Sequence, residues 1–168
     1  MVVWIIGLSG AGKTTLADQL LRELKSDGIH NVVNLDGDVI RGVFGNDLGY
    51  TIEDRKKNSS RISAFSKFLD EQGIHVISPT LSLFQSTRDW NRNHIQNYFE
   101  VFIDVPIQVL ADRDPKGLYA AYNEGKISNV VGMDLEFERP EKPHLVIKNT
   151  LDEQGFLANT EKLKHLFE

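Results

Sequence analysis

The sequence contains the octapeptide Gly7-Leu8-Ser9-Gly10-Ala11-Gly12-Lys13-Thr14, which fits the pattern G-x-x-x-x-G-K-[ST]. An apolar run at residues 2–6 comes directly before it, and Leu16, Leu20 and Leu24 recur after it at the spacing of one helix face. A strand, a glycine-rich loop and a helix in this order are the setting in which the pattern binds phosphate. We therefore predict that this loop surrounds the phosphates of a nucleotide, in preference to a glycine-rich turn with a chance lysine.

The predicted loop offers a phosphate several complementary groups. Its glycines let backbone N–H groups converge on an anion, and the N-terminus of the following helix adds the positive end of its dipole. Lys13 is placed to reach the outer phosphates, and the Thr14 hydroxyl to hold Mg²⁺. The residues predicted to bind the nucleotide are Gly7, Ser9, Gly10, Ala11, Gly12, Lys13, Thr14 and Thr15.

Length and composition indicate an ordinary globular domain. The 168 residues are 40% hydrophobic and 26% charged, and we expect them to form a single domain over residues 1–168. The net charge of −5 argues against binding nucleic acid through a basic surface. The absence of cysteine excludes disulfides and thiolate sites and fits a reducing cytoplasm. The first apolar run is too short to cross a membrane and lacks signal-peptide features, so we expect a cytoplasmic protein without a membrane partner.

Strand and helix signals alternate along the chain. This alternation predicts an α/β fold of the phosphate-loop kinase type, a three-layer sandwich in which helices cover both faces of a mainly parallel, five-stranded sheet. Pro79 is expected to stop the third strand. The strands are expected at 2–6, 31–35, 74–78, 101–104 and 145–147, and the helices at 15–25, 52–71, 86–97, after Pro106 and at about 152–167.

Two long irregular stretches, residues 42–51 and about 128–143, interrupt this pattern. Such stretches in a compact domain are usually lids or binding loops. Val130, Val131 and Phe137 in the second stretch would be costly to leave in water, which favours a lid over a disordered insertion. We call residues 128–143 the lid segment.

Chemically useful residues are expected to meet at the edge of the sheet where the parallel strands end. Asp38 is the candidate base for an acceptor hydroxyl, and Asp36 is the candidate for holding Mg²⁺ through water. The competing interpretation is that Asp38 is the N-cap of a short helix over residues 39–43. The stretches expected to share this edge are the phosphate loop and residues 36–38, 78–82 and 104–105.

Basic residues concentrate near the same edge although the protein is acidic overall. Arg55, Asn58 and Arg61 are three residues apart and so share one helix face, which suits gripping a ligand better than completing a core. Arg113 and Lys116 stand in a turn, where the guanidinium could stack on a base and the ammonium could contact a phosphate; a plain turn is the simpler interpretation. The five histidines show no metal-ligand spacing.

These motifs together resemble the adenylylsulfate kinase family, whose members phosphorylate the 3′-hydroxyl of adenylyl sulfate with ATP. The resemblance covers nearly the whole chain in the same order, and its specific parts are Asp36-Gly37-Asp38 and Arg113-Asp114-Pro115-Lys116-Gly117-Leu118-Tyr119. It implies ATP and Mg²⁺ as cofactors, Asp38 as the base, a lid at 128–143 and a homodimer. It also implies that Tyr50 stacks on the acceptor's base and that Arg113 contacts the bound ATP. The residues expected around the acceptor nucleotide are Asp36, Asp38, Arg41, Tyr50, Arg55, Asn58, Leu81, Ser82, Gln85, Lys116 and Val130.

The acceptor side departs from the family pattern. Where the family typically reads Ile-Ser-Pro-Tyr-Arg after the third strand, this chain reads Leu81-Ser82-Leu83-Phe84-Gln85, and Val130 stands where a phenylalanine is usual. An arginine toward the acceptor's anionic end is thus replaced by neutral Gln85, and one of two rings around the acceptor's base is missing. The chain also resembles a branch of the family that acts on cytidine diphosphoramidate, whose terminal NH₂ could donate to the Gln85 amide oxygen. That acceptor is the alternative to adenylyl sulfate.

Two other classes of function fit the chain less well. A GTPase-like switch would carry an Asn-Lys-x-Asp motif after a later strand, and the sequence contains none. A nucleotide-binding relic without activity would not be expected to keep Lys13, Thr14, Asp36 and Asp38. We therefore predict a small-molecule kinase with a nucleotide acceptor.

Overall fold

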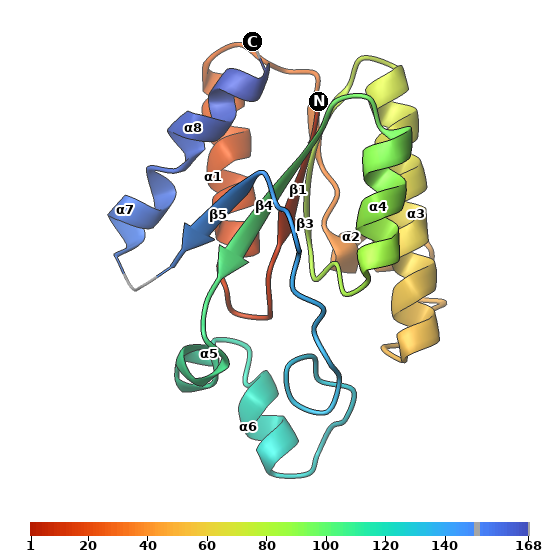
Figure 1. The fold of residues 1–168 in the computed structure, drawn as a ribbon, viewed down its shortest axis with the longest axis vertical. Coiled ribbons are helices and arrows are strands. Elements are labelled where there is room, and N and C mark those ends of the chain that lie inside the picture. The colour runs from red at the N-terminus through yellow and green to blue at the C-terminus, as the bar shows by residue number, and fades with distance from the viewer. Residues whose placement is uncertain (150–151, 168) are drawn as a thin grey trace.

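A five-stranded sheet runs through the middle of the computed structural model, which describes residues 1–149 and 152–167 (Figure 1). Its spatial order is β2-β3-β1-β4-β5, and every neighbouring pair is parallel. The predicted α/β fold is therefore confirmed. The strands are β1 (Val2–Ile6), β2 (Val32–Asn34), β3 (His75–Thr80), β4 (Tyr98–Asp104) and β5 (Leu145–Lys148).

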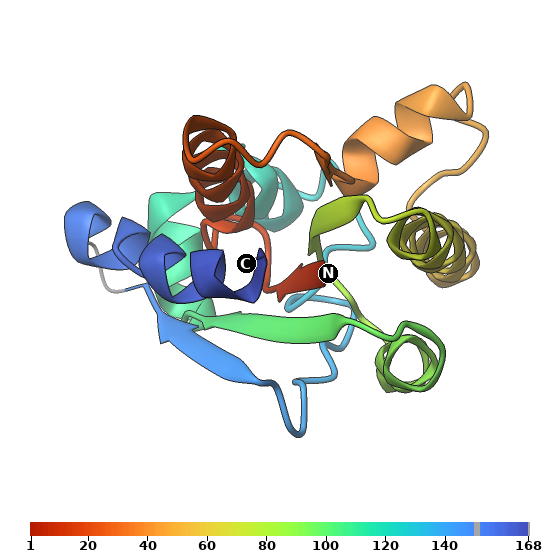
Figure 2. The same ribbon diagram turned by 90° about the horizontal axis from the view of Figure 1, so that it is seen from above.

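Helices cover both faces of the sheet and complete three layers (Figures 1 and 2). One face carries α1 (Lys13–Ser26), α7 (Glu153–Leu157) and α8 (Thr160–Lys164), and the other carries α3 (Ile52–Glu71) and α4 (Gln85–His94). The shorter helices are α2 (Gly37–Val43) after β2, α5 (Ile107–Arg113) after β4 and α6 (Leu118–Asn123), and a 3₁₀ turn at His165–Phe167 comes last. Within the described part of the chain, no helix combines the length and apolar character needed to span a bilayer.

The core explains why β1 is apolar at every position. Successive side chains of a strand point to opposite faces, and both faces of this central strand are covered. Val3 and Ile5 join the cluster under α1, whereas Trp4 and Ile6 join a second cluster with Ile62 of α3. Burial on both faces fixes β1 and thereby the start of the phosphate loop that follows it.

The prediction that Pro79 stops the third strand is wrong, because β3 continues to Thr80. Alternate residues of a parallel strand bond to opposite neighbours, and Ile77 O accepts from Leu35 N on the β2 side. Pro79, two residues further on, faces the same side, but β2 has already ended there. The missing N–H therefore leaves no ladder bond unmade, and the strand ends two residues beyond its predicted end.

The C-terminal segment also differs from the single helix expected at about 152–167, because α7 and α8 are separate. Between them, Asn159 Nδ2 donates to Phe156 O at 2.9 Å and to Gly155 O at 3.3 Å. An asparagine that binds carbonyls of the preceding turn competes with the helix ladder, which accounts for the break. The polar helix expected at 86–97 begins at Gln85 and ends at His94, and α6 had no counterpart in the prediction.

Candidate active site

A cavity of about 510 Å³ opens where the strands end. Its walls come from the phosphate loop, the turn after β2, the first half of α3, the loop after β3 and residues 127–131. The predicted site residues that line it are Ser9, Lys13, Thr14, Asp36, Asp38, Arg41, Tyr50, Arg55, Asn58, Leu81, Ser82, Lys116 and Val130. The fold thus brings the predicted phosphate loop and most of the predicted acceptor residues into one space.

The phosphate loop joins the end of β1 to the start of α1 at Lys13. Gly12 precedes the helix with a φ of 102°, and no side chain caps the first turn, which leaves its N–H groups available to a ligand. A Cβ on Gly12 would lie 2.8 Å from Asn149 Nδ2 and 3.0 Å from the Phe156 ring. The loop is therefore packed closely from behind by α7 and by the chain after β5.

Replacing Gly12 with alanine is expected to destabilise the fold by about 2–4 kcal/mol, because the new methyl group meets both a positive φ and two neighbouring side chains. Gly28 is the matched control, since its φ is 89° but a Cβ there would meet nothing within 4 Å. Gly28→Ala should cost only about 1 kcal/mol, from the backbone alone. Urea unfolding of both variants measures the difference, and equal losses would contradict the close packing behind the loop.

Lys13 lies within the loop, where its Nζ donates to Leu8 O at 2.9 Å. The pKa of Lys13 is lowered to about 8, chiefly by burial and then by Lys116, while Asp36 and Asp38 act in the opposite direction. Since burial outweighs the two carboxylates, the charged ammonium is disfavoured in the site without a ligand. A bound phosphate would supply the missing negative charge.

Thr14 and Asp36 place oxygen atoms side by side, with Thr14 Oγ1 donating to Asp36 Oδ2 at 3.5 Å. A hydroxyl and a carboxylate of this kind fit Mg²⁺, which often takes one or two protein ligands and completes its shell with phosphate oxygens and water. Across residues 1–149 and 152–167, His, Cys, Asp and Glu form no group of three that could hold a metal by themselves. The pair therefore suits a metal that arrives with a nucleotide.

Asp36, and not Asp38, is the N-cap of α2, because Asp36 Oδ1 accepts from Asp38 N at 2.8 Å. The competing interpretation of Asp38 as a helix cap is thus wrong. The Asp38 side chain lines the cavity, and its Oδ2 lies 3.9 Å from Lys116 Nζ. A carboxylate that is not used for capping can act on a ligand.

Tyr50 lines the cavity with an exposed ring, and two arginines contact that ring. Arg41 Cζ lies 4.9 Å and Arg55 Cζ 5.4 Å from the ring centroid. Arg41 Nη1 donates to Gly49 O at 2.7 Å, and Arg55 Nη2 donates to Asn129 O at 2.8 Å. Burial lowers the pKa of Arg55, with Arg41 as the second cause. Two cations beside an exposed ring suit a ligand that is both aromatic and anionic.

Helix α3 adds to the cavity two polar atoms that have no protein partner. Asn58 Nδ2 donates to Gly37 O at 3.1 Å, which sets the amide orientation and leaves Oδ1 unpaired. Ser59 Oγ is also unpaired, and both side chains are more than nine-tenths buried and line the cavity. Sequence reasoning missed Ser59, because no motif marks a serine at this position. Both atoms are therefore available to hydrogen-bond a ligand in the cavity.

Seven of the predicted nucleotide or acceptor residues, and Arg61, lie outside the cavity lining. Besides Gln85 and Arg113, these are the phosphate-loop residues Gly7, Gly10, Ala11, Gly12 and Thr15. Gln85 Oε1 accepts from Arg88 Nη2 at 2.7 Å, so the oxygen expected to accept from the acceptor is already held by the protein. Arg61 donates twice to Asp47, at 2.8 and 2.6 Å. Arg113 donates to a backbone carbonyl just after β5, at 2.9 Å. The expectation for Gln85 is thereby corrected, because its side chain serves α4 and not the cavity.

The lid segment packs over the cavity through two valines. Val130 and Val131 are 2% and 4% exposed, and both line the cavity. Asp134 shapes this turn, because its carboxylate accepts from Asn129 N at 2.8 Å and from Val130 N at 2.6 Å. The two valines are thus sheltered from water as expected, while movement of the segment as a lid stays a prediction.

Comparison with known proteins places this geometry in a family. The family model described as adenylylsulphate kinase matches residues 1–148. An adenylyl-sulfate kinase of Halothermothrix orenii is 40% identical over 158 residues, covering 92% of this chain and 85% of that protein. A cytidine diphosphoramidate kinase of Campylobacter jejuni subsp. jejuni is also 40% identical, over 149 residues, covering 89% of this chain and 86% of that protein.

A solved structure agrees with the sequence relatives. The APS kinase of Mycobacterium tuberculosis, determined in complex with AMPPNP and APS, has a TM-score of 0.87 and 33% identity, covering 98% of this chain and 95% of that one. The match therefore includes the phosphate loop, the acceptor side and the lid segment. With its family model, relatives and fold in agreement, the chain belongs to the adenylylsulphate kinase family and is a phosphotransferase that acts on an alcohol group.

Proposed function

We propose that the protein transfers the γ-phosphate of ATP to the 3′-hydroxyl of adenylyl sulfate. The observation that carries the proposal is the presence of Lys13 and Asp38 in one cavity with the acceptor-side residues. The adenylyl-sulfate kinase of H. orenii and the APS kinase solved with AMPPNP and APS support the same donor and acceptor.

In the proposed reaction, the N–H groups of the phosphate loop and the Lys13 ammonium bind the phosphates of ATP. Thr14 and, through water, Asp36 would hold Mg²⁺, which would supply charge neutralisation at the transferred phosphate. Asp38 accepts the proton of the acceptor hydroxyl as that oxygen bonds to the γ-phosphorus and ADP departs. Tyr50 and the two arginines beside it orient the acceptor nucleotide.

The test is ADP release by the purified protein with ATP, Mg²⁺ and a panel of nucleotide acceptors, followed by phosphorus NMR of the product. Efficient turnover of adenylyl sulfate to a 3′-phosphorylated product is the expected result. ADP release that does not depend on any acceptor would contradict the proposal and would indicate a binding or switch protein.

We also propose cytidine diphosphoramidate as a second candidate acceptor, because specific observations favour it. Asn58 Oδ1 is an unpaired oxygen that can only accept, so it suits a terminal NH₂, whereas a sulfate offers no N–H. Val130 supplies no ring opposite Tyr50, which suits a smaller base. The C. jejuni kinase, at 40% identity, supports this acceptor. Turnover of cytidine diphosphoramidate with little turnover of adenylyl sulfate in the same panel would decide for it.

Binding of ATP is expected to weaken as the pH rises through about 8. The free protein loses the Lys13 proton with a pKa of about 8, whereas a bound phosphate keeps Lys13 protonated to higher pH, so binding takes up a proton there. The Kd for ATP should therefore rise by up to about tenfold per pH unit above pH 8. Calorimetric titration from pH 7 to 9.5 measures this rise. Lys13→Met is the control, with weak binding that does not vary over this range, and a constant Kd in the unmodified protein would contradict the assignment.

We propose a cytoplasmic homodimer. Phe65, Phe68 and Trp90 are large side chains exposed by 39%, 56% and 37% on α3 and α4, and exposed aromatic residues on neighbouring elements often mark an interface. Sedimentation equilibrium should give the mass of a dimer for the unmodified protein and the mass of a monomer for Phe68→Glu. A monomer in both cases would contradict the proposal.

A further inference from the structure

Arg88, in the first turn of α4, is a charged side chain with no exposed surface. Its Nη1 donates to Ser82 O, its Nη2 to Glu138 O at 3.0 Å, and its Nε and Nη2 to Gln85 Oε1 at 3.1 and 2.7 Å. All of these acceptors are neutral. Burying a guanidinium whose hydrogen-bond acceptors are neutral is costly, and burial accordingly lowers the pKa of Arg88, although the nearby Glu100 and Glu138 carboxylates act in the opposite direction. Such a cost suggests a requirement other than stability at this position.

The Ser82 carbonyl that Arg88 holds belongs to the wall of the cavity. Leu81, Ser82, Leu83 and Phe84 all line the cavity, and we call residues 81–84 the acceptor wall. Ser82 has a φ of 47°, which is an unfavourable conformation for a residue with a side chain. Its Oγ accepts from Trp4 Nε1 at 2.9 Å, so this wall is held from the sheet and from α4 at once. The bond to Arg88 helps to keep this strained turn in place.

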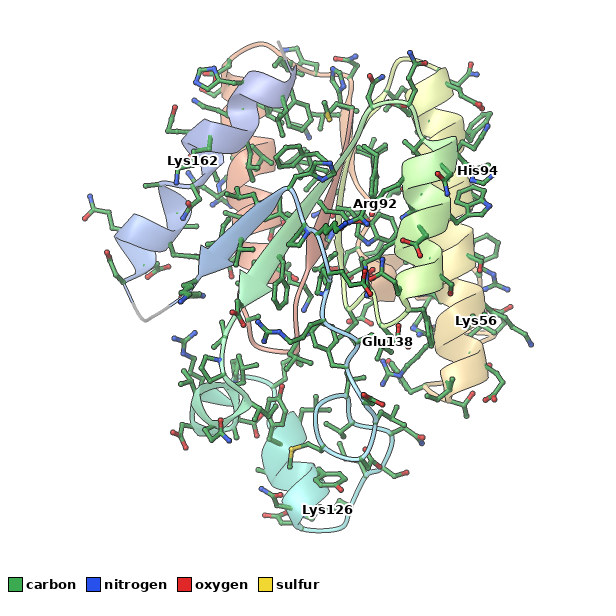
Figure 3. The ribbon with its side chains drawn as sticks, in the orientation of Figure 1. Lys56, Arg92, His94, Lys126, Glu138 and Lys162 are labelled. Carbon is green, nitrogen blue, oxygen red and sulfur yellow. The ribbon has the colours of Figure 1, made fainter. Side chains whose placement is uncertain are left out.

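The same arginine also contacts the C-terminal half of the lid segment. Besides the bond from Arg88 to Glu138 O, the Glu138 carboxylate accepts from Gln85 N at 2.8 Å and so caps α4. One turn further along α4, Arg92 donates to Lys142 O at 2.9 Å and pairs with the buried Glu100 of β4. Figure 3 shows Glu138 near the start of α4 and Arg92 between α4 and β4. Two arginines on one face of α4 thus hold two carbonyls of the lid segment.

We propose that Arg88 is a positioning residue for phosphoryl transfer, because it joins the acceptor wall and the C-terminal half of the lid segment to one rigid helix. It touches no reacting atom and acts through the Ser82 and Glu138 backbone. Its loss should let the acceptor wall relax from the strained turn and displace the acceptor from Asp38, while the phosphate loop, on the other side of the cavity, stays unchanged. Arg92 makes the matching contact with the lid segment but bonds to no residue of the cavity lining, which makes it the control.

The experiment compares Arg88→Lys with Arg92→Lys. Hydrogen exchange should be at least tenfold faster over residues 81–86 in Arg88→Lys, whereas in Arg92→Lys the acceleration should be confined to residues 140–144. The kcat/KM for the acceptor should fall at least about tenfold in Arg88→Lys, as small displacements of a reacting group commonly cause. The Kd for ATP should stay within about twofold in both variants. Melting temperatures of both variants separate positioning from a general loss of stability.

The kinetic part rests on the proposed function, and the exchange part does not. If the unmodified protein phosphorylates no acceptor in the panel, the proposed function fails, while exchange over residues 81–86 still decides the role of Arg88. Unchanged exchange there, or equal losses for ATP and acceptor, would overturn the proposal. If Arg88→Lys does not fold, Gln85→Ala carries the test, because it removes the oxygen that accepts from Arg88 Nε and Nη2 and that side chain lies outside the cavity lining. It should raise the KM for the acceptor about threefold and leave the Kd for ATP unchanged, and an unchanged KM would overturn the proposal.

Discussion

Replacing Asp38 with asparagine is expected to lower kcat for phosphoryl transfer by about 10²- to 10⁴-fold, the range that a well-placed general base contributes. The Asp38 side chain lines the cavity, and the N-cap of α2 is Asp36 and not Asp38. Asparagine has nearly the same shape but cannot take a proton from the acceptor hydroxyl, so the fold and the phosphate loop should remain as they are. A coupled assay of ADP release, with ATP and acceptor both saturating, measures this kcat.

The control for this substitution is Asp112→Asn, since Asp112 is an exposed residue of α5 outside the cavity lining. Its kcat should equal that of the unmodified protein. The Kd for ATP in Asp38→Asn should stay within about twofold, because the lost group acts on the acceptor. A variant that binds ATP normally and keeps more than a tenth of kcat would show that Asp38 is not the base.

The elements that local patterns specify could be predicted from the sequence. The phosphate loop and α1 follow from glycine spacing and a leucine repeat, both of which lie within twenty residues. Whether β3 continues past Pro79 depends on where β2 ends. The residues around Pro79 do not specify where β2 ends. The break in the last helix depends on the carbonyls that Asn159 can reach. These differences arise where a distant or side-chain contact outweighs the local preference.

In the candidate site, too, some residues could be placed from the sequence and others could not. Residues at strand ends, such as Asp36 and Asp38, could be placed because parallel strands end at one edge. Ser59 could not be placed, since its position in the cavity depends on how α3 rotates against the sheet. Gln85 was expected at the acceptor, but Arg88 of the same helix turn holds its oxygen at 2.7 Å. A substitution seen in a motif therefore locates a change in the site without showing what the new side chain contacts.

Replacing Lys13 with methionine is expected to lower kcat/KM for ATP by about 10²- to 10³-fold, the loss typical of removing one fixed charge from a transition-state site. Without the ammonium, Asp36 and Asp38 would both face the phosphates with less positive charge to oppose them. Lys116 cannot replace it, because its side chain is 68% exposed and lies beside Asp38. Lys116→Met should accordingly cost at most about tenfold, as expected for a screened surface charge.

The same substitution is expected to leave the protein at least as stable, which separates a catalytic loss from a folding defect. Burial lowers the Lys13 pKa from 10.5 to about 8 in the folded protein. Between about pH 8 and pH 10.5, Lys13 keeps its proton in the unfolded chain but has lost it in the folded protein. The free energy of unfolding therefore rises with pH over this range. At pH 7 the charge opposes folding, and methionine removes it. Urea unfolding at pH 7 and pH 9.5 should therefore show a pH-dependent gain in the unmodified protein that Lys13→Met lacks, and a methionine variant less stable at pH 7 would contradict the assignment.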